Sequence, residues 1–269
     1  MRAIKIDGPA AFQQSVKDVL TKIRSNLIGQ IIASSIEGIE DKDLTIVPFD
    51  AGKAAVLGSC NASAKADSPL DKAPKGISGD LRGESAWYVG KEDDPNTRED
   101  ERYTRVPSGL KGTGAGSDVH LFFTPDSRGR SGCGGGDFGS LPDETLLHEM
   151  VHSLRHMQGK TNQIPTEGTL RGYDNEEEFL AIVVTNVYMS VNNKTHLRAD
   201  HDGFKALDSS LATSAGFLSD EGNLKLMNIY KLVWQPTFWN LYTVTTARFN
   251  PFRELTLRLN YLTNYMPYQ

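Results

Sequence analysis

Two histidines and a glutamate stand together in the sequence HEMVH at residues 148–152. In a helix, residues four apart lie on the same face, so both imidazoles can approach one Zn²⁺ at about 2.0–2.1 Å. Glu149 then lies beside them, where its carboxylate can take a proton from a zinc-bound water. This HExxH pattern predicts a zinc-dependent hydrolase, with His148 and His152 as metal ligands and Glu149 as the general base.

The residues around this motif carry the signals of a helix, which is expected to span 141–159. Ser140 is placed to cap its start, and Ser140 with Asp143 resembles a capping box. Gly159 is placed to stop it. The apolar residues of the segment recur at helical spacing on one face, which predicts a buried, amphipathic helix that holds the two histidines away from the centre of its apolar stripe.

A catalytic zinc needs a third protein ligand, and the sequence contains no HExxHxxGxxH motif that would supply a third histidine nearby. The first choice is Glu178, at the start of a second expected helix over 175–191. Ala181, three residues later, would let the two helices approach closely. Glu177 is the alternative within this helix. A less favoured source lies in an expected loop beyond it, with His196, Asp200 and His201.

Three further residues of this region are candidates for supporting roles. Tyr173 and Tyr188 could each stabilise the oxyanion of a tetrahedral intermediate, with simple packing as the alternative for both. Tyr188 is the tyrosine assigned to catalysis. Asn186 lies on an otherwise apolar helix and is a candidate for orienting a metal ligand.

The N-terminal half mixes one long helical pattern with short strand patterns. Apolar residues recur every three or four positions from about Pro9 to Ile36, which predicts a helix with a break near Gly29. Strands are predicted at 43–50 (DLTIVPFD), 85–90 (SAWYVG) and 119–125 (VHLFFTP). The last of these is expected to be the edge strand that pairs with an extended peptide substrate. The charged, glycine-containing segment 91–116 is expected to be a loop.

The sequence of the C-terminal part predicts helices. Three or four helices are expected from about Gly203 onward, with Trp234, Trp239, Phe249 and Phe252 as packing anchors. Helices flanking a few strands predict an α+β fold, helix-rich with a small mixed sheet. We expect one catalytic domain over 1–269, in which about 192–269 is a helical extension.

Composition excludes several classes of protein. Hydrophobic residues make up 38% and charged residues 23% of the 269 residues, values typical of a folded globular protein. The formal net charge of −5 gives no basic excess, so no nucleic-acid partner is expected. The sequence has neither the apolar core of a cleaved signal peptide nor an apolar run that would span a membrane. Cys60 and Cys133 are either free thiols or a disulfide.

The order of these segments resembles the NleD-like effector metallopeptidases and related toxin domains of secreted bacterial proteins. The resemblance covers about residues 1–190. Its specific parts are the Pro-x-x-x-Leu-Leu-His-Glu-x-x-His segment and a Glu-x-x-Ala-x-x-x-x-Asn segment, which matches Glu178, Ala181 and Asn186. It implies a zincin-like, gluzincin-type zinc protease delivered into a target cell, with His148, His152 and Glu178 as ligands. The region 192–269 has no counterpart in the resemblance, which leaves the substrate open.

The leading hypothesis is therefore a zinc metalloendopeptidase, secreted without a cleaved signal peptide as an effector or toxin. Its expected partners are a protein or peptide substrate in a host cell or a prey bacterium, an immunity protein, and a component of a type III or type VI secretion machinery. One alternative is a zinc amidase acting on cell-wall peptides. Another is a binding module that keeps the scaffold without turnover, although the intact Glu149 argues against it.

Overall fold

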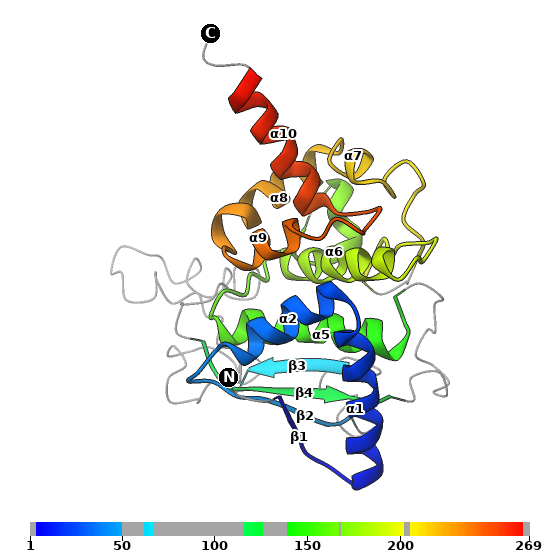
Figure 1. The fold of residues 1–269 in the computed structure, drawn as a ribbon, viewed down its shortest axis with the longest axis vertical. Helices are drawn as coiled ribbons and strands as arrows, with labels where there is room; N and C mark the ends of the chain where they lie inside the picture. The colour runs from blue at the N-terminus through cyan, green and yellow to red at the C-terminus, as the bar shows by residue number, and fades with distance from the viewer. Residues whose placement is uncertain are drawn as a thin grey trace, which may run out of the picture.

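A mixed β-sheet forms one side of the molecule, and most of the helices are stacked above it in successive layers, while the N-terminal helix runs beside the sheet (Figure 1). The computed structural model describes residues 4–49, 62–66, 116–125, 139–166, 168–201 and 205–265. Within these residues the strands are β1 (Lys5–Ile6), β2 (Leu44–Pro48), β3 (Ala62–Ala66) and β4 (Val119–Phe123). The α+β arrangement expected from the sequence is thus present.

The sheet has the strand order β1-β2-β4-β3, with β1, β2 and β4 parallel and β3 antiparallel to β4. The strands predicted at 43–50 and 119–125 are confirmed as β2 and β4. The prediction that the latter is an edge strand is wrong, because β4 is hydrogen-bonded to β2 on one side and to β3 on the other. The strand predicted at 85–90, most of the loop 91–116 and both cysteines lie outside the described residues.

The N-terminal helical pattern forms two helices, α1 (Ala10–Arg24) and α2 (Leu27–Glu37). The break falls at Asn26, whose side chain accepts a hydrogen bond from the Ile28 backbone N–H at 2.9 Å and so caps α2. The predicted break is confirmed, although it falls three residues before Gly29. Gly29 instead allows close approach, because a Cβ there would lie 2.0 Å from the carbonyl oxygen of Ile23 in α1.

The HExxH segment forms α5 (Pro142–Met157), which packs against α1, α2, β3, β4 and α6 (Glu176–Val191) and is buried on almost every side. The expected capping box of Ser140 and Asp143 is wrong. The helix is capped at Leu141, whose backbone N–H donates to the Glu144 carboxylate at 3.1 Å. The helix ends where predicted, with Gly159 at a φ of 60° just beyond it.

A 3₁₀ helix (Gly168–Tyr173) precedes α6, and four helices follow it in the described residues. These are α7 (Ser214–Phe217), α8 (Glu221–Val233), α9 (Thr237–Tyr242) and α10 (Pro251–Tyr265), which agrees with the expected three or four. Three of the predicted anchors, Trp234, Phe249 and Phe252, are buried in the same hydrophobic cluster as residues of α5 and the sheet. Trp239 is 36% exposed, so its prediction as an anchor is wrong. Within the described residues, no helix has the length and apolar character needed to cross a membrane.

Candidate metal centre

The helix α5 presents His148 and His152 on one face, as the HExxH spacing predicts. Both side chains are buried, and their rings meet edge to face with centroids 4.7 Å apart. The two Nε2 atoms lie 3.0 Å from each other. Two imidazole nitrogens held this closely in a buried position need a proton or a cation between them, because two lone pairs facing each other repel.

Glu178 reaches these nitrogens from the first turn of α6. Its Oε2 lies 3.0 Å from His148 Nε2 and 3.3 Å from His152 Nε2. The start of α6 is fixed by Asn175, whose side chain accepts a hydrogen bond from the Glu178 backbone N–H at 2.9 Å. The neighbouring Glu177 points elsewhere, with its Oε1 accepting from Arg155 Nε at 2.8 Å and lying 3.9 Å from His152 Nδ1.

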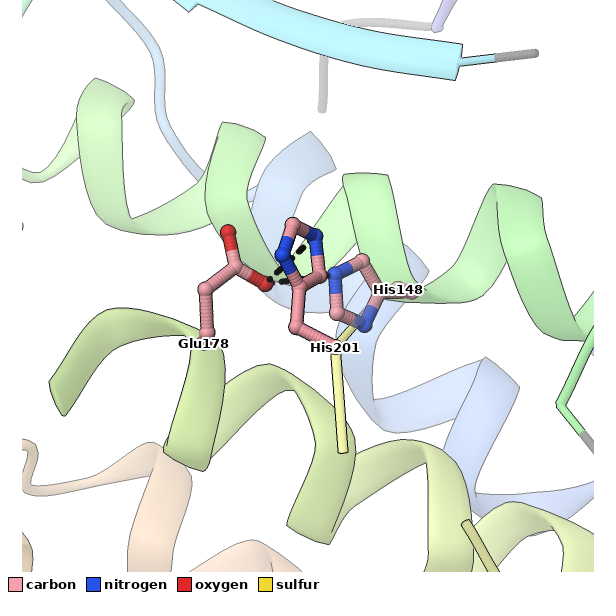
Figure 2. Close-up of side chains that lie close together, drawn as sticks. All are labelled: His148, Glu178 and His201. Carbon is pink, nitrogen blue, oxygen red and sulfur yellow. Dashed lines mark hydrogen bonds and ion pairs between the residues drawn. The ribbon is translucent and has the colours of Figure 1, made fainter. Parts of the chain in front are cut away.

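A third histidine joins this group from the segment that follows α6. His201 Nε2 lies 3.4 Å from Glu178 Oε2, and its ring stacks on that of His148 with centroids 6.0 Å apart. Figure 2 shows the Glu178 carboxylate directed at both rings. Among the described residues, ligand atoms of His148, Glu178 and His201 lie within 4.8 Å of one another, a spacing suited to one metal ion. His196 and Asp200, which were also candidate ligands from the sequence, are not in this group.

The side chains of His148, His152 and Glu178 shift one another's pKa values. Burial opposes the charged form of His152, but the carboxylates of Glu178, Glu177 and Glu149 together outweigh it and raise the pKa of His152 well above its usual value. Burial likewise opposes ionisation of Glu178, yet His152 and His148 hold the pKa of Glu178 well below its usual value. Burial lowers the pKa of His148 to about 3. Glu178 is therefore ionised and His148 neutral at neutral pH, so the site has one carboxylate and one imidazole lone pair facing the same point.

This donor set fits a zinc ion. Zinc in proteins takes imidazole nitrogens and carboxylate oxygens, and a catalytic site holds it with three protein ligands such as two histidines and a glutamate. The positive charge at this point resides on His152, held there by Glu178. A divalent cation would replace that proton and neutralise the buried carboxylate, since metal ligands must be deprotonated to bind.

Glu149 differs from its two neighbours because its side chain is only half-buried. Its carboxylate lies near enough to His152 to contribute to the raised pKa of that histidine. Ser153 donates a hydrogen bond to the Glu149 backbone carbonyl at 2.8 Å, so this contact does not engage the glutamate side chain. The residue assigned as the general base is thus beside the ligands and accessible from solvent.

The structure does not bring Tyr188 to this group. Its hydroxyl donates to Asp143 Oδ2 at 2.9 Å, at the start of α5, and the side chain is fully buried. Burial and the Asp143 carboxylate raise the pKa of Tyr188. Tyr173 is also buried and packs edge to face on Phe179, with ring centroids 5.1 Å apart. Both tyrosines therefore have packing and hydrogen-bonding environments of their own.

Tyr188→Phe is expected to weaken the fold without affecting the metal site. A buried hydrogen bond to a charged group contributes about 1.5–3 kcal/mol, so the free energy of unfolding should fall by about that amount. Denaturant titration and zinc content of the same sample provide the measurement, with Tyr242→Phe on α9 as the control. Unchanged stability together with lost turnover would instead support the catalytic role expected from the sequence.

Asn186 is placed to orient the segment that carries His201. Its amide donates to the Arg198 carbonyl at 2.8 Å, and its side-chain oxygen accepts from the Arg198 backbone N–H at 2.8 Å. The Arg198 guanidinium in turn donates to the backbone carbonyls of Asp200 and His201. The orienting role expected for Asn186 thus has a specific route in the structure, through the backbone that leads to His201.

A protein-family model named peptidase M91, described as effector protein, matches residues 1–206. The match includes α5, α6 and the segment with His201, and it ends before α7. No curated protein and no solved structure matches the sequence significantly.

Proposed function

The chain belongs to the peptidase M91 family of effector proteins, and from this premise we propose that it is a zinc-dependent metalloendopeptidase. Membership supports a peptidase that serves as a bacterial effector. The observation that carries the finer proposal is the convergence of His148 Nε2, His152 Nε2 and Glu178 Oε2, which lie 3.0–3.3 Å from one another. Such a set of two imidazoles and one carboxylate is typical of the gluzincin type of zincin site.

The residues of the site divide two tasks between them in this proposal. His148, His152 and Glu178 hold the ion, which when bound acidifies water and polarises the carbonyl of the peptide bond. Glu149 takes a proton from the attacking water and afterwards passes it to the amine that leaves. Its half-buried position allows water to reach it, whereas the two histidine ligands are buried.

The packing of α5 supports this division of tasks. Rigid elements position catalytic groups better than loops, and α5 is held by the sheet on one side and by α6 on the other. Glu178 is fixed by the cap at Asn175. The ligands are therefore arranged before any metal or substrate arrives, so less free energy is lost in ordering them on binding.

We further propose that the substrate is a protein of a target cell, reached through a secretion machinery of the type III or type VI class. Effector membership supports delivery. A producing cell that keeps such a peptidase in its own compartment would need an immunity protein, which is the second expected partner. The net charge of −5 gives no electrostatic reason to expect nucleic acid.

Metal content is the direct test of this function. We expect elemental analysis to find about one zinc per chain in the purified protein. The double variant His148→Ala, His152→Ala should contain none and should fail to cleave denatured casein. The matched control is His120→Ala, His196→Ala, which removes two histidines outside the metal group and should keep both zinc and activity.

Two outcomes would contradict the proposal. If the wild-type protein holds no zinc even after reconstitution, the cluster of His148, His152 and Glu178 has only a structural role. Zinc-dependent cleavage of peptidoglycan but not of casein would replace the endopeptidase with a cell-wall amidase, because the same zinc chemistry serves both amides.

A further inference from the structure

We propose that His201 is a fourth ligand of the metal, held in its ligating tautomer by Asp174. The inference rests on the proposed zinc site and extends it, since the HExxH motif and the family resemblance account for His148, His152 and Glu178 alone. It is carried by the spacing of the ligand atoms, by the partner of the second ring nitrogen of His201, and by the way its segment is anchored.

The distances from Glu178 Oε2 to three imidazole nitrogens are close to those between ligand atoms around one ion. Ligand atoms at about 2.0–2.1 Å from a tetrahedral ion are separated from one another by about 3.3–3.4 Å. His201 Nε2 lies 3.4 Å from Glu178 Oε2, and His152 Nε2 lies 3.3 Å from the same oxygen. His148 Nε2, at 3.0 Å from this oxygen, is slightly closer. Glu178 Oε2 is thus the common neighbour of three imidazole nitrogens, each near the separation that one ion would require.

The second nitrogen of His201 has the partner that a metal-binding histidine needs. His201 Nδ1 lies 2.6 Å from Asp174 Oδ2. A carboxylate accepts but does not donate when ionised, so the ring proton of a neutral His201 resides on Nδ1. Its Nε2 then carries the lone pair and faces Glu178 Oε2. A carboxylate–histidine–metal arrangement of this kind fixes the tautomer and makes the imidazole a better ligand.

The backbone holds both members of this pair in place. Asp174 adopts a φ of 59°, an unusual value for a residue with a side chain, and such conformations concentrate at functional sites. The His201 backbone N–H donates to the carbonyl of Gly172 at 2.8 Å, which ties its segment to the residues just before α6. On the other side, Arg198 is buried and donates to the carbonyls of Asp200 and His201. The ring is therefore positioned by contacts from two directions.

A fourth protein ligand has a consequence for access to the metal. Four protein ligands close a zinc site, whereas catalysis requires a position open to water or substrate. The side chain of His201 is 34% exposed, against 4% for His148 and 10% for His152. It is also the one of the four that lies outside a helix. His201 is therefore the ligand that faces incoming substrate and the one that can be replaced at the open position.

Metal affinity separates this role from a purely structural one. His201→Ala is expected to weaken Zn²⁺ binding by at least the roughly 10- to 100-fold that loss of an outer partner costs, measured in competition with a chromophoric chelator. The absorption spectrum of the Co²⁺-substituted protein should change as well, because one nitrogen ligand is lost. Free imidazole should restore the wild-type spectrum of this variant by filling the vacated position.

Two further variants complete the experiment. Asp174→Asn keeps His201 but weakens the control of its tautomer, and it should reduce Zn²⁺ affinity by about 10- to 100-fold. Should His201→Ala fail to fold, as circular dichroism would show, this variant still decides whether the pair supports the metal. His196→Ala, a histidine of the same segment outside the metal group, should bind Zn²⁺ as the wild type does.

The failure of this inference is distinguishable from that of the proposed function. Wild-type protein that binds no Zn²⁺ would refute the metal site as a whole. Wild-type protein that binds one Zn²⁺, together with unchanged affinity and an unchanged Co²⁺ spectrum in His201→Ala, would leave the site intact and refute only the role of His201. A spectrum changed by the substitution but insensitive to imidazole would also contradict a ligating role.

Discussion

Glu149→Gln is expected to lower the rate of peptide hydrolysis by about 10²- to 10⁴-fold while zinc stays bound, because this is the contribution typical of a general base. Glutamine has nearly the same size and shape as glutamate but cannot accept the proton of the attacking water. The substituted side chain keeps its place on α5, so His148 and His152 should still face the ion. Initial rates of casein cleavage and zinc content, measured on the same sample, give the two quantities.

The control is Glu221→Gln on α8, an exposed glutamate of another helix, which should leave both quantities unchanged. Full activity in Glu149→Gln would show that another group accepts the proton. Simultaneous loss of zinc and activity would show that Glu149 contributes to metal binding, which would contradict its assignment as a base. The structure favours the assignment as a base, since Glu149 is a half-buried neighbour of His148 on α5, while His148, His152 and Glu178 lie 3.0–3.3 Å from one another.

The helix that carries the motif was predictable because its signals are local. Helical spacing of apolar residues and a terminal glycine define 141–159, and the structure has α5 over Pro142–Met157. The choice of Glu178 over Glu177 rested on Ala181, whose small side chain three residues later lets the two helices approach, and the structure places Glu178 Oε2 3.0 Å from His148 Nε2. The sequence could not reveal that Glu177 forms an ion pair with Arg155. The Arg155 guanidinium comes from the neighbouring helix α5.

His201 shows where prediction from sequence reaches its limit. It lies 23 residues after Glu178, in a segment without regular structure, and the sequence suggested it only together with His196 and Asp200. Its position depends on the hydrogen bonds between Asn186 and the backbone of Arg198, which are tertiary contacts. The periodicity of apolar residues predicts a helix. It does not predict where the irregular segment after that helix packs in the folded chain.

The position of β4 in the sheet was mispredicted for a related reason. Its partner β3 has the sequence ASAKA, which lacks the apolar alternation by which strands are recognised. Without β3, the strand Val119–Phe123 would have one free side and would be an edge. In the described sheet β3 occupies that side, so any strand addition by a peptide would have to occur at β3 or β1.

The C-terminal helices contact the elements of the candidate metal centre through Arg155. Loss of this side chain is expected to have the largest effect on stability. Arg155 Nε donates to both carboxylate oxygens of Glu177, at 2.8 and 3.1 Å. Its guanidinium lies 5.2 Å from the ring centroid of Tyr230 and 5.6 Å from that of Trp234, both from the α8 region. The ion pair of Arg155 and Glu177 thus joins α5, α6 and α8 next to His152 and Glu178. The helix α8 lies beyond the residues matched by the family model.

Arg155→Met should lower the free energy of unfolding by about 3–5 kcal/mol, because it leaves a buried charge without its partner. The side chains of Arg155 and Glu177 are only 1% and 3% exposed. Denaturant titration in the presence of a chelator measures this effect, since bound metal would add its own stabilisation. Adding Glu177→Gln to the variant removes the unpaired carboxylate and should recover a large part of the loss.

An exposed pair serves as the matched control. Arg258 Nε donates to Glu254 across one turn of α10 at 2.9 Å, with 39% and 31% of the two side chains exposed. Surface pairs of this kind contribute at most about 1 kcal/mol, so Arg258→Met should have a small effect. Equal losses in Arg155→Met and Arg258→Met would show that the buried pair is not what joins the C-terminal helices to α5. If Arg155→Met lowers the free energy of unfolding strongly and Glu177→Gln does not restore it, the loss comes from the contacts of Arg155 with Tyr230 and Trp234.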